Sequence, residues 1–145
     1  MSLDFKYIVD NLPYDEPFLF VDAISQVDEN GIKGSYTFKK DAFFYKGHFK
    51  NNPITPGVIL VECMAQIGLV SLGIWMAKNE KRDFSKVAFS STNVDFLHLV
   101  LPGEKVWVES SKKYFRFGKL NCDVVMKNSD GALVCRGNLS GMLIK

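Results

Sequence analysis

Residues 57–77 read GVILVECMAQIGLVSLGIWMA. The only strongly polar side chains in this run are Glu62 and Gln66, which are four positions apart and therefore share one helix face. Pro56 stands just before the run, where a helix loses little by lacking an N–H group. The run predicts one long helix, and a helix that is apolar on all sides is either buried in a core or spans a membrane.

The length of this run would by itself permit a membrane span, since a span needs about 20 apolar residues. Glu62 lies well inside the run, where a charge is expensive in lipid. Three glycines, Gly57, Gly68 and Gly73, lower its hydropathy. In the flanking segments polar and apolar residues alternate as they do in strands, and such strands need an apolar surface to pack on. We therefore expect a buried central helix rather than a membrane span.

The segment before the helix, residues 43–56, reads FFYKGHFKNNPITP and carries His48, fourteen positions before Glu62. Its prolines and asparagines favour a turn-rich loop of set shape, which can hold His48 in one place. The first helical turn has N–H groups without intrahelical partners, beginning with Gly57, and the positive end of the helix dipole lies there too. The stretch therefore offers a base, an acid and a site for an oxygen that carries negative charge.

These residues form a pattern that resembles the FabZ-like 3-hydroxyacyl-[acyl-carrier-protein] dehydratases of type II fatty acid synthesis. The motif positions are residues 47–49 (GHF), Pro53, residues 56–58 (PGV), Glu62 and residues 65–66 (AQ). Residues 17–22 (PFLFVD) and 94–104 are also similar to that family, so the resemblance covers nearly the whole chain.

The resemblance implies an α+β hotdog fold, in which an antiparallel β-sheet wraps around one long central α-helix. We expect one such domain over residues 1–145. The family also implies a homodimer with two active sites at the interface. Whether dimers associate further into a tetramer or hexamer stays open.

Carried over by position, His48 is the catalytic base and Glu62 is the acid from the partner subunit. The Gly57 N–H binds the thioester carbonyl, and Val58, Phe49 and Gln66 lie at the substrate, with Gln66 as a hydrogen-bonding orienter of the site. The implied reaction converts a (3R)-3-hydroxyacyl thioester on an acyl carrier protein into the trans-2-enoyl thioester, in fatty acid, polyene, polyketide or lipid A precursor synthesis. Proton transfer through His48 alone is an alternative to the two-residue scheme.

The sequence departs from the family pattern at two places. Lys50-Asn51-Asn52 stands where the family commonly has Pro-Gly-Arg, and residues 96–100 (FLHLV) replace an arginine-rich segment. Those arginines are associated with carrier docking, so we expect a difference in carrier or substrate. Glu62 resembles the branch that only dehydrates, since the isomerising branch usually has Asp there.

Two other functions remain open. A hotdog acyl thioesterase would use a carboxylate to activate water and would not need His48. A non-catalytic acyl-binding subunit of a heteromeric dehydratase would need neither His48 nor Glu62, and the presence of both argues against it.

The rest of the chain predicts one short helix and five or six strands. We expect the helix over residues 4–12 and a charged link over residues 78–86. The expected strands cover residues 17–27, 32–39, 87–99 (as one strand or two), 106–117, 118–127 and 132–144. Turns are expected at Asn30-Gly31, Pro102-Gly103 and residues 129–131.

Composition narrows the class of protein. The chain has 145 residues, 47% apolar residues and a net charge of +2, which suits a soluble domain and argues against nucleic-acid binding. The early acidic residues and the lack of a signal-peptide core predict a cytoplasmic protein. Three cysteines without metal spacing read as small core residues, and we expect neither metal nor cofactor. His98 reads as structural or surface, and lysines near the motif would steer an acidic carrier protein.

Overall fold

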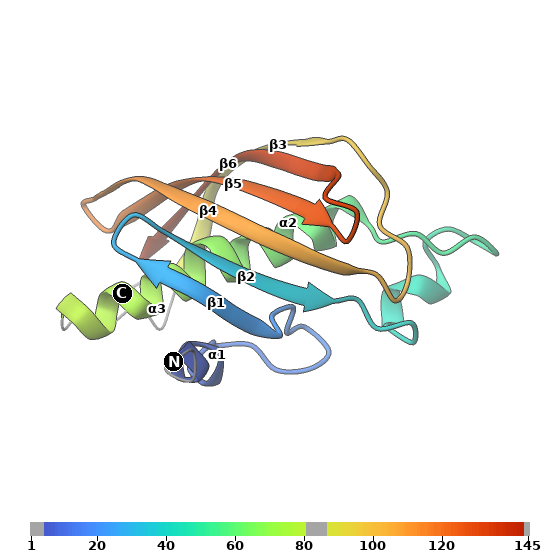
Figure 1. Cartoon of the computed structure of the whole chain (residues 1–145), viewed down its shortest axis with the longest axis horizontal. Helices are drawn as coiled ribbons and strands as arrows, with labels where there is room; N and C mark the ends of the chain where they lie inside the picture. The colour runs from blue at the N-terminus through green and yellow to red at the C-terminus, as the bar shows by residue number, and fades with distance from the viewer. Residues whose placement is uncertain (1–4, 81–86, 144–145) are drawn as a thin grey trace.

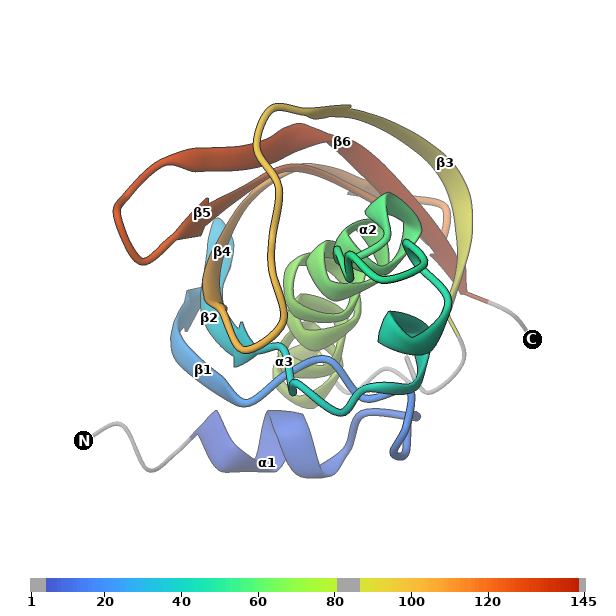
Figure 2. The ribbon, with the colours of Figure 1, turned by 90° about the vertical axis from the view of Figure 1, so that its right-hand side faces the viewer.

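The sheet and the central helix together define the architecture (Figure 1). The computed structural model describes residues 5–80 and 87–143. Six antiparallel strands in the order β1-β2-β4-β5-β6-β3 form one sheet, which curves around the helix (Figure 2). This arrangement confirms the expected hotdog fold.

The six strands are β1 (Ala23–Asp28), β2 (Gly31–Thr37), β3 (Val87–Phe96), β4 (Lys105–Arg116), β5 (Lys119–Asn128) and β6 (Leu133–Leu143). The helical segments are α1 (Lys6–Asp10), η2 (Phe43–Lys46), α2 (Gly57–Ala65), η3 (Gln66–Val70) and α3 (Ser71–Glu80). The last three follow one another without a break and make up the central helix.

A π-helical turn, η3, interrupts the central helix at its middle, which the sequence analysis did not predict. Two hydroxyl groups bind carbonyl oxygens of this turn: Ser71 Oγ donates to Gln66 O at 2.7 Å, and Ser110 Oγ of β4 donates to Gly68 O at 2.9 Å. An added Cβ at Gly68 would lie 3.1 Å from the Ser110 Cβ, so the glycine lets the helix pack closely on the sheet.

The central helix is the core of the molecule. Residues Gly57–Lys78 are long and apolar enough to cross a membrane, with a mean hydropathy of 1.9, but 72% of the residues in the apolar window are buried inside the protein. The strands present alternate residues to it: Ile32, Gly34, Tyr36 and Phe38 are all buried, as predicted. The expectation of a buried core helix is confirmed.

Some predicted boundaries were wrong. The first strand begins at Ala23 rather than at Pro17, because the backbone of Phe18 and Phe20 is bound by the side chain of Gln66 instead of by a neighbouring strand. One strand or two were expected over residues 87–99. The structure has a single strand there, which ends at Phe96, and the exposed His98 follows it. The central helix continues to Glu80, and the rest of the expected link, residues 81–86, lies outside the described residues.

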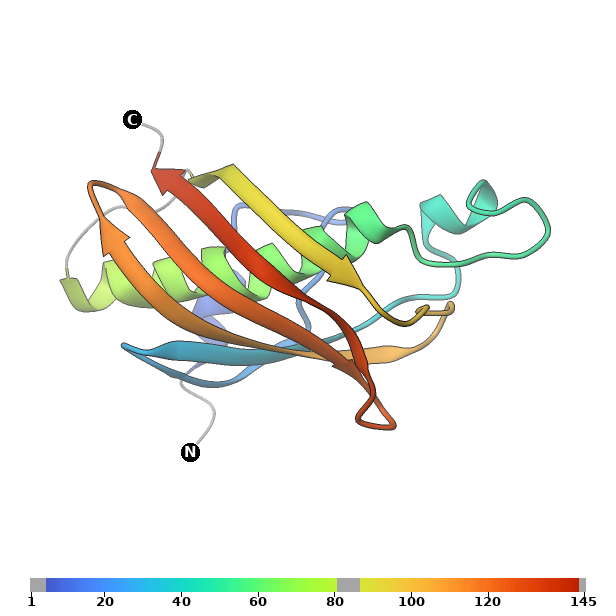
Figure 3. The same ribbon diagram turned by 90° about the horizontal axis from the view of Figure 1, so that it is seen from above.

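The motif loop (residues 43–56) and the β4–β5 hairpin lie at opposite ends of the molecule (Figure 3). Residues 43–56, at the N-terminal end of α2, project beyond the sheet, and they include His48. The β4–β5 hairpin lies at the opposite end. A site built on His48 therefore belongs to the first of these two ends.

Candidate active site

Three hydrogen bonds fix the position of His48 within its loop. The His48 N–H donates to Phe44 O at 3.1 Å, and the His48 carbonyl accepts from the Ile54 N–H at 2.8 Å. The ring nitrogen Nδ1 lies 3.0 Å from Ile54 O. Because a carbonyl oxygen can only accept, Nδ1 must carry the proton, which leaves Nε2 as a proton acceptor. The loop thus holds the imidazole in the tautomer that a general base needs.

The loop itself is anchored by Thr55, which is buried. Its N–H donates to Val100 O at 2.9 Å, and its hydroxyl is hydrogen-bonded to the Tyr45 hydroxyl. These bonds join the loop to η2 on one side and to the segment after β3 on the other. Phe49 stacks on His48, with ring centroids 4.3 Å apart, and is half-exposed.

The first turn of α2 provides free backbone donors next to this loop. Pro56 O accepts from the N–H groups of Ile59 and Leu60, so the N–H groups of Gly57 and Val58 precede the intrahelical ladder. An added Cβ at Gly57 would lie 3.2 Å from the Phe96 ring, so a larger residue here would push this ring outward. Val58 is 76% exposed.

Gln66 orients Glu62 one helical turn away, as the sequence predicts for residues four apart. The Gln66 side chain is fully buried. Its Nε2 donates to Glu62 Oε2 at 3.1 Å and to Phe18 O at 3.0 Å, and its Oε1 accepts from the Phe20 N–H at 2.7 Å. Both N–H groups of the amide and its oxygen are thus bonded, and one of the N–H groups holds the carboxylate.

Glu62 opens into a cavity of about 200 Å³. The lining residues are Tyr14, Glu62, Ala65, Leu69, Val70, Val87, Ala88, Phe89 and Gly141. His48 is not among them, so within one protomer the structure groups Glu62 with Gln66 but not with the imidazole. Sequence reasoning missed Tyr14, because no motif or spacing relates it to Glu62 and only the tertiary fold brings the two together.

The FabA-like domain model matches residues 12–138 of this chain. The chain belongs to the FabA-like family. Proteins described as FabZ 3-hydroxyacyl-[acyl-carrier-protein] dehydratases are similar to it over most of its length. That of Caldicellulosiruptor bescii is 32% identical, covering 91% of this chain and 92% of the relative. That of Bacillus velezensis is 34% identical, covering 95% and 96%.

Solved structures support the fold of this FabA-like chain. The dehydratase heterocomplex ApeI:P from Xenorhabdus doucetiae matches with a TM-score of 0.80 at 17% identity, covering 94% of this chain and 91% of that one. Cj0977, a virulence protein of Campylobacter jejuni, matches with a TM-score of 0.71 at 9% identity, covering 100% and 93%. At these identities the likeness shows the fold alone.

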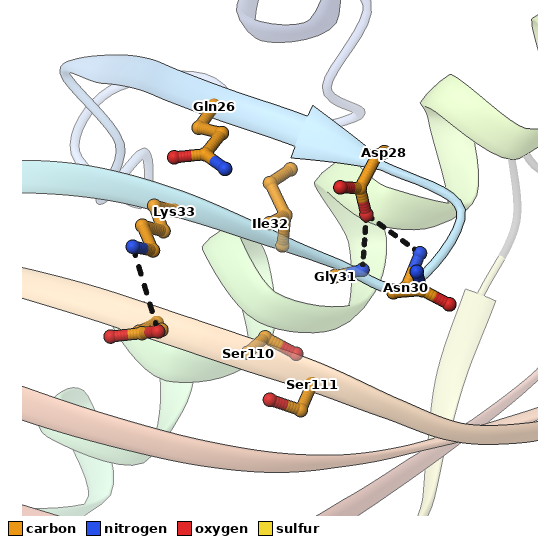
Figure 4. A pocket seen from close by; sticks show the side chains of 9 residues that line it. Gln26, Asp28, Asn30, Gly31, Ile32, Lys33, Ser110 and Ser111 are labelled. Atoms are coloured by element: carbon orange, nitrogen blue, oxygen red, sulfur yellow. Dashed lines mark hydrogen bonds and ion pairs between the residues drawn. The ribbon is translucent and has the colours of Figure 1, made fainter.

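A second cavity of this FabA-like protein, of about 250 Å³, lies between the β1–β2 turn and β4 (Figure 4). Its Asp28 carboxylate accepts from the N–H groups of Asn30 and Gly31, and Lys33 pairs with Glu109 at 3.6 Å. The charged groups are thus already partnered, and the cavity includes none of the predicted site residues. Among residues 5–80 and 87–143, no group of three or more His, Cys, Asp or Glu side chains is arranged to hold a metal.

Proposed function

We propose that this chain is a dehydratase that removes water from a (3R)-3-hydroxyacyl thioester carried by an acyl carrier protein, in fatty acid or related biosynthesis. The observation that carries this proposal is the 3.0 Å contact of His48 Nδ1 with Ile54 O, which assigns the proton to Nδ1 and leaves Nε2 as a proton acceptor. The loop that holds His48 leads directly into the helix terminus whose first N–H groups lack intrahelical partners. The FabZ relatives, similar over nearly the whole chain, support the same activity.

In the proposed reaction, His48 Nε2 takes the proton from C2 of the substrate. The Gly57 N–H donates to the thioester carbonyl oxygen, which gains negative charge as that proton leaves. Glu62 gives a proton to the hydroxyl on C3, the C3–O bond breaks and water departs. The electron pair of the C2–H bond becomes the C2–C3 double bond.

We propose further that the site is completed in a homodimer, with Glu62 and His48 supplied by different protomers. β3 is an edge strand of the sheet, and most of its residues are exposed. Large apolar side chains on β3 and on the segment after it are about half-exposed: Phe89, Phe96, Leu97, Leu99 and Leu101. An edge with free backbone groups and an apolar surface favours pairing with another chain, and a second copy would cover it.

The proposed carrier partner is acidic, and exposed lysines lie around the projecting loop. Lys40, Lys46 and Lys50 are exposed, whereas Lys39 is paired with Glu16 at 2.9 Å. Lys40, Lys46 and Lys50 have no ion-pair partner among residues 5–80 and 87–143, and they would attract an acidic protein to the end of the molecule that bears His48. A cytoplasmic location suits such a carrier-dependent enzyme.

The test is hydration of a short trans-2-enoyl thioester, on carrier protein or coenzyme A, followed by the loss of enone absorbance. We expect the wild-type protein to hydrate it and His48→Ala to lose at least about 10²-fold in kcat, the lower end of the contribution of a general base. His98→Ala is the matched control and should keep full activity, since the His98 side chain is exposed and makes no hydrogen bond or ion pair with residues 5–80 and 87–143. Release of free thiol by the wild-type protein would instead identify a thioesterase.

Mixing two inactive variants tests the shared site. His48→Ala and Glu62→Gln protomers, refolded together, form mixed dimers in which one site has lost both groups and the other has both. If the site is shared, statistical mixing restores about one quarter of the wild-type activity. If each protomer has its own complete site, mixing restores none.

A further inference from the structure

One side chain beside Glu62 has no part in the reaction described so far. Tyr14 precedes the segment that Gln66 binds, and its ring packs against the core. Its hydroxyl has no hydrogen-bond partner among residues 5–80 and 87–143. Tyr14 is partly buried, and no fully buried polar side-chain atom among the described residues lacks a partner, so this hydroxyl is open to solvent and is free to bind a group that enters the space in front of it.

The walls of the Glu62 cavity narrow the choice of that group. Of the nine lining residues, only Tyr14 and Glu62 have polar side-chain atoms, and the other seven are apolar or glycine. Any oxygen atom of a ligand that enters this cavity must therefore be bound by these two side chains or by backbone. Such a pairing of one donor and one carboxyl group suits a hydroxyl or a water molecule.

Gln66 sets the relative position of the two side chains. It holds Glu62 Oε2 on the helix and, through Phe18 O and Phe20 N, the chain segment that follows Tyr14. No group of residues 5–80 and 87–143 bonds to the other carboxyl oxygen, Oε1, which is therefore available to a ligand. One buried amide therefore holds both the acid and the backbone segment that follows the phenol.

The phenol stays protonated in this environment. Burial, and then the charge of Glu62, raise the pKa of Tyr14 to about 12. The neighbouring thiol of Cys63 is fully buried, which raises its pKa well above 9.0. The residues that β3 and β6 contribute to the cavity, Val87, Ala88, Phe89 and Gly141, have no ionisable side chain. Tyr14 is therefore a neutral hydrogen-bond donor at physiological pH.

We propose that Tyr14 is a further catalytic residue, which together with Glu62 holds the oxygen atom that the substrate loses as water. This inference rests on the proposed dehydratase function. During elimination the C3 oxygen accepts a hydrogen bond from the Tyr14 O–H while it takes the proton of Glu62. The C3–O electron pair stays on the oxygen, the C2 proton stays on His48, and Tyr14 keeps its own proton throughout.

Tyr14→Phe tests this role, because it removes the hydroxyl and keeps the ring that packs on the core. We expect kcat to fall about 10²-fold with KM nearly unchanged, as for the loss of a donor that acts in the transition state. Tyr7→Phe is the matched control, because Tyr7 is a half-buried tyrosine of α1 that does not line this cavity. Removing the Tyr7 hydroxyl should leave kcat unchanged.

A second substrate separates catalysis from a merely structural effect. A 3-chloroacyl thioester loses chloride, which needs no proton from Glu62 and little help from a donor. The defect of Tyr14→Phe should shrink to a few-fold on this substrate while His48→Ala stays inactive on both. Equal defects on both substrates, or none on the hydroxy substrate, would overturn the role of Tyr14. A wild-type protein inactive on every thioester would overturn the proposed function, and this inference with it.

Discussion

At the scale of single residues, Gln66 links the central helix to the segment before β1 through hydrogen bonds of its side chain. Its amide bonds to the backbone of Phe18 and Phe20 and to the carboxylate of Glu62 from a fully buried position. A buried polar group of this kind costs free energy unless every bond is made, so it specifies one arrangement of the segments it joins.

Gln66→Leu should therefore destabilise the protein strongly. The leucine fits the helix but leaves the Phe20 N–H and the Phe18 carbonyl without partners, at a cost of about 1–3 kcal/mol for each group that stays buried. Urea unfolding measures the loss. Gln26→Leu, at an exposed position of β1, is the control and should change the free energy of unfolding by less than about 0.5 kcal/mol. Equal stability of the two variants would contradict this reading of Gln66.

The residue scale also shows which candidate site residues a sequence can indicate. His48 and Glu62 could be proposed from the sequence because a single imidazole in a turn-rich loop and a single carboxylate in an apolar helix stand out by type and spacing, and their roles stay predictions. The bond from Nδ1 to Ile54 O could not be, since both atoms belong to irregular backbone whose path depends on tertiary contacts. Tyr14 was missed for the same reason.

At the scale of elements, the β4–β5 hairpin carries a local strain. Phe117 has φ 52° and Gly118 has φ 77°, the two positive values of a type I′ turn. Glycine adopts this backbone freely, but phenylalanine does not. Phe117 is 97% exposed, so it gains no burial energy that could offset the cost of this conformation.

Phe117→Asn should stabilise the hairpin, because asparagine tolerates the left-handed region. We expect a gain of about 1 kcal/mol, the lower part of the cost of that conformation for an ordinary residue. Thermal unfolding would show a raised midpoint. Phe117→Leu, which also lacks the aromatic ring but keeps an unfavourable side chain, should give no such gain, and a gain equal to that of asparagine would refute the backbone explanation.

The pairing of β3 with β6 depends on a glycine. An added Cβ at Gly137 would collide with the backbone carbonyl oxygen of Asn93, the residue of β3 next to Val94, its partner in the ladder. Gly137→Ala should push the edge strand away and cost about 2 kcal/mol or more in urea unfolding. Gly47→Ala is the matched control, since nothing lies within 4 Å of its added Cβ, and a similar loss there would contradict the steric account.

Elements with strict alternation were the easiest to predict. β2 alternates between buried and more exposed residues throughout, and β5 does so except at the buried Asn121, so their position and orientation follow from the pattern. Residues 17–22 failed because PFLFVD is as apolar as a strand, while its backbone is bound by a side chain of the helix. The π-helical turn at residues 66–70 left no mark in the sequence that distinguishes it from an ordinary helical turn.

At the scale of the whole molecule, three thiols are enclosed by the sheet and the helix. Burial raises the pKa of Cys122 to about 11 and that of Cys135 to about 12, and raises the pKa of Cys63 well above 9.0. The unfolded chain ionises its thiols near 9.0, so above that pH it binds fewer protons than the folded protein. Stability is therefore fully present below pH 9 and declines as the pH rises toward the folded values.

The free energy of unfolding should thus fall between pH 9 and pH 11, by up to about 1.4 kcal/mol per pH unit for each thiol. Urea unfolding at pH 7, 9, 10 and 11 measures this slope. Cys122→Ala should give a shallower slope between pH 9 and 11 than the wild-type protein, whatever its stability at pH 7. A slope unchanged by this substitution would show that the thiol is not the group responsible.

The order in which the chain is made gives the central helix a further consequence. Residues 57–80 are synthesised before β3, β5 and β6, and β4 also comes later. At a synthesis rate of about 5–20 residues per second, the strands that bury the helix are completed about 3–13 s after it. During that time the nascent chain displays a segment as long and apolar as a membrane anchor. Glu62 is the sixth residue of this segment, and a carboxylate inside an apolar run makes its insertion into a bilayer less favourable before the strands cover it.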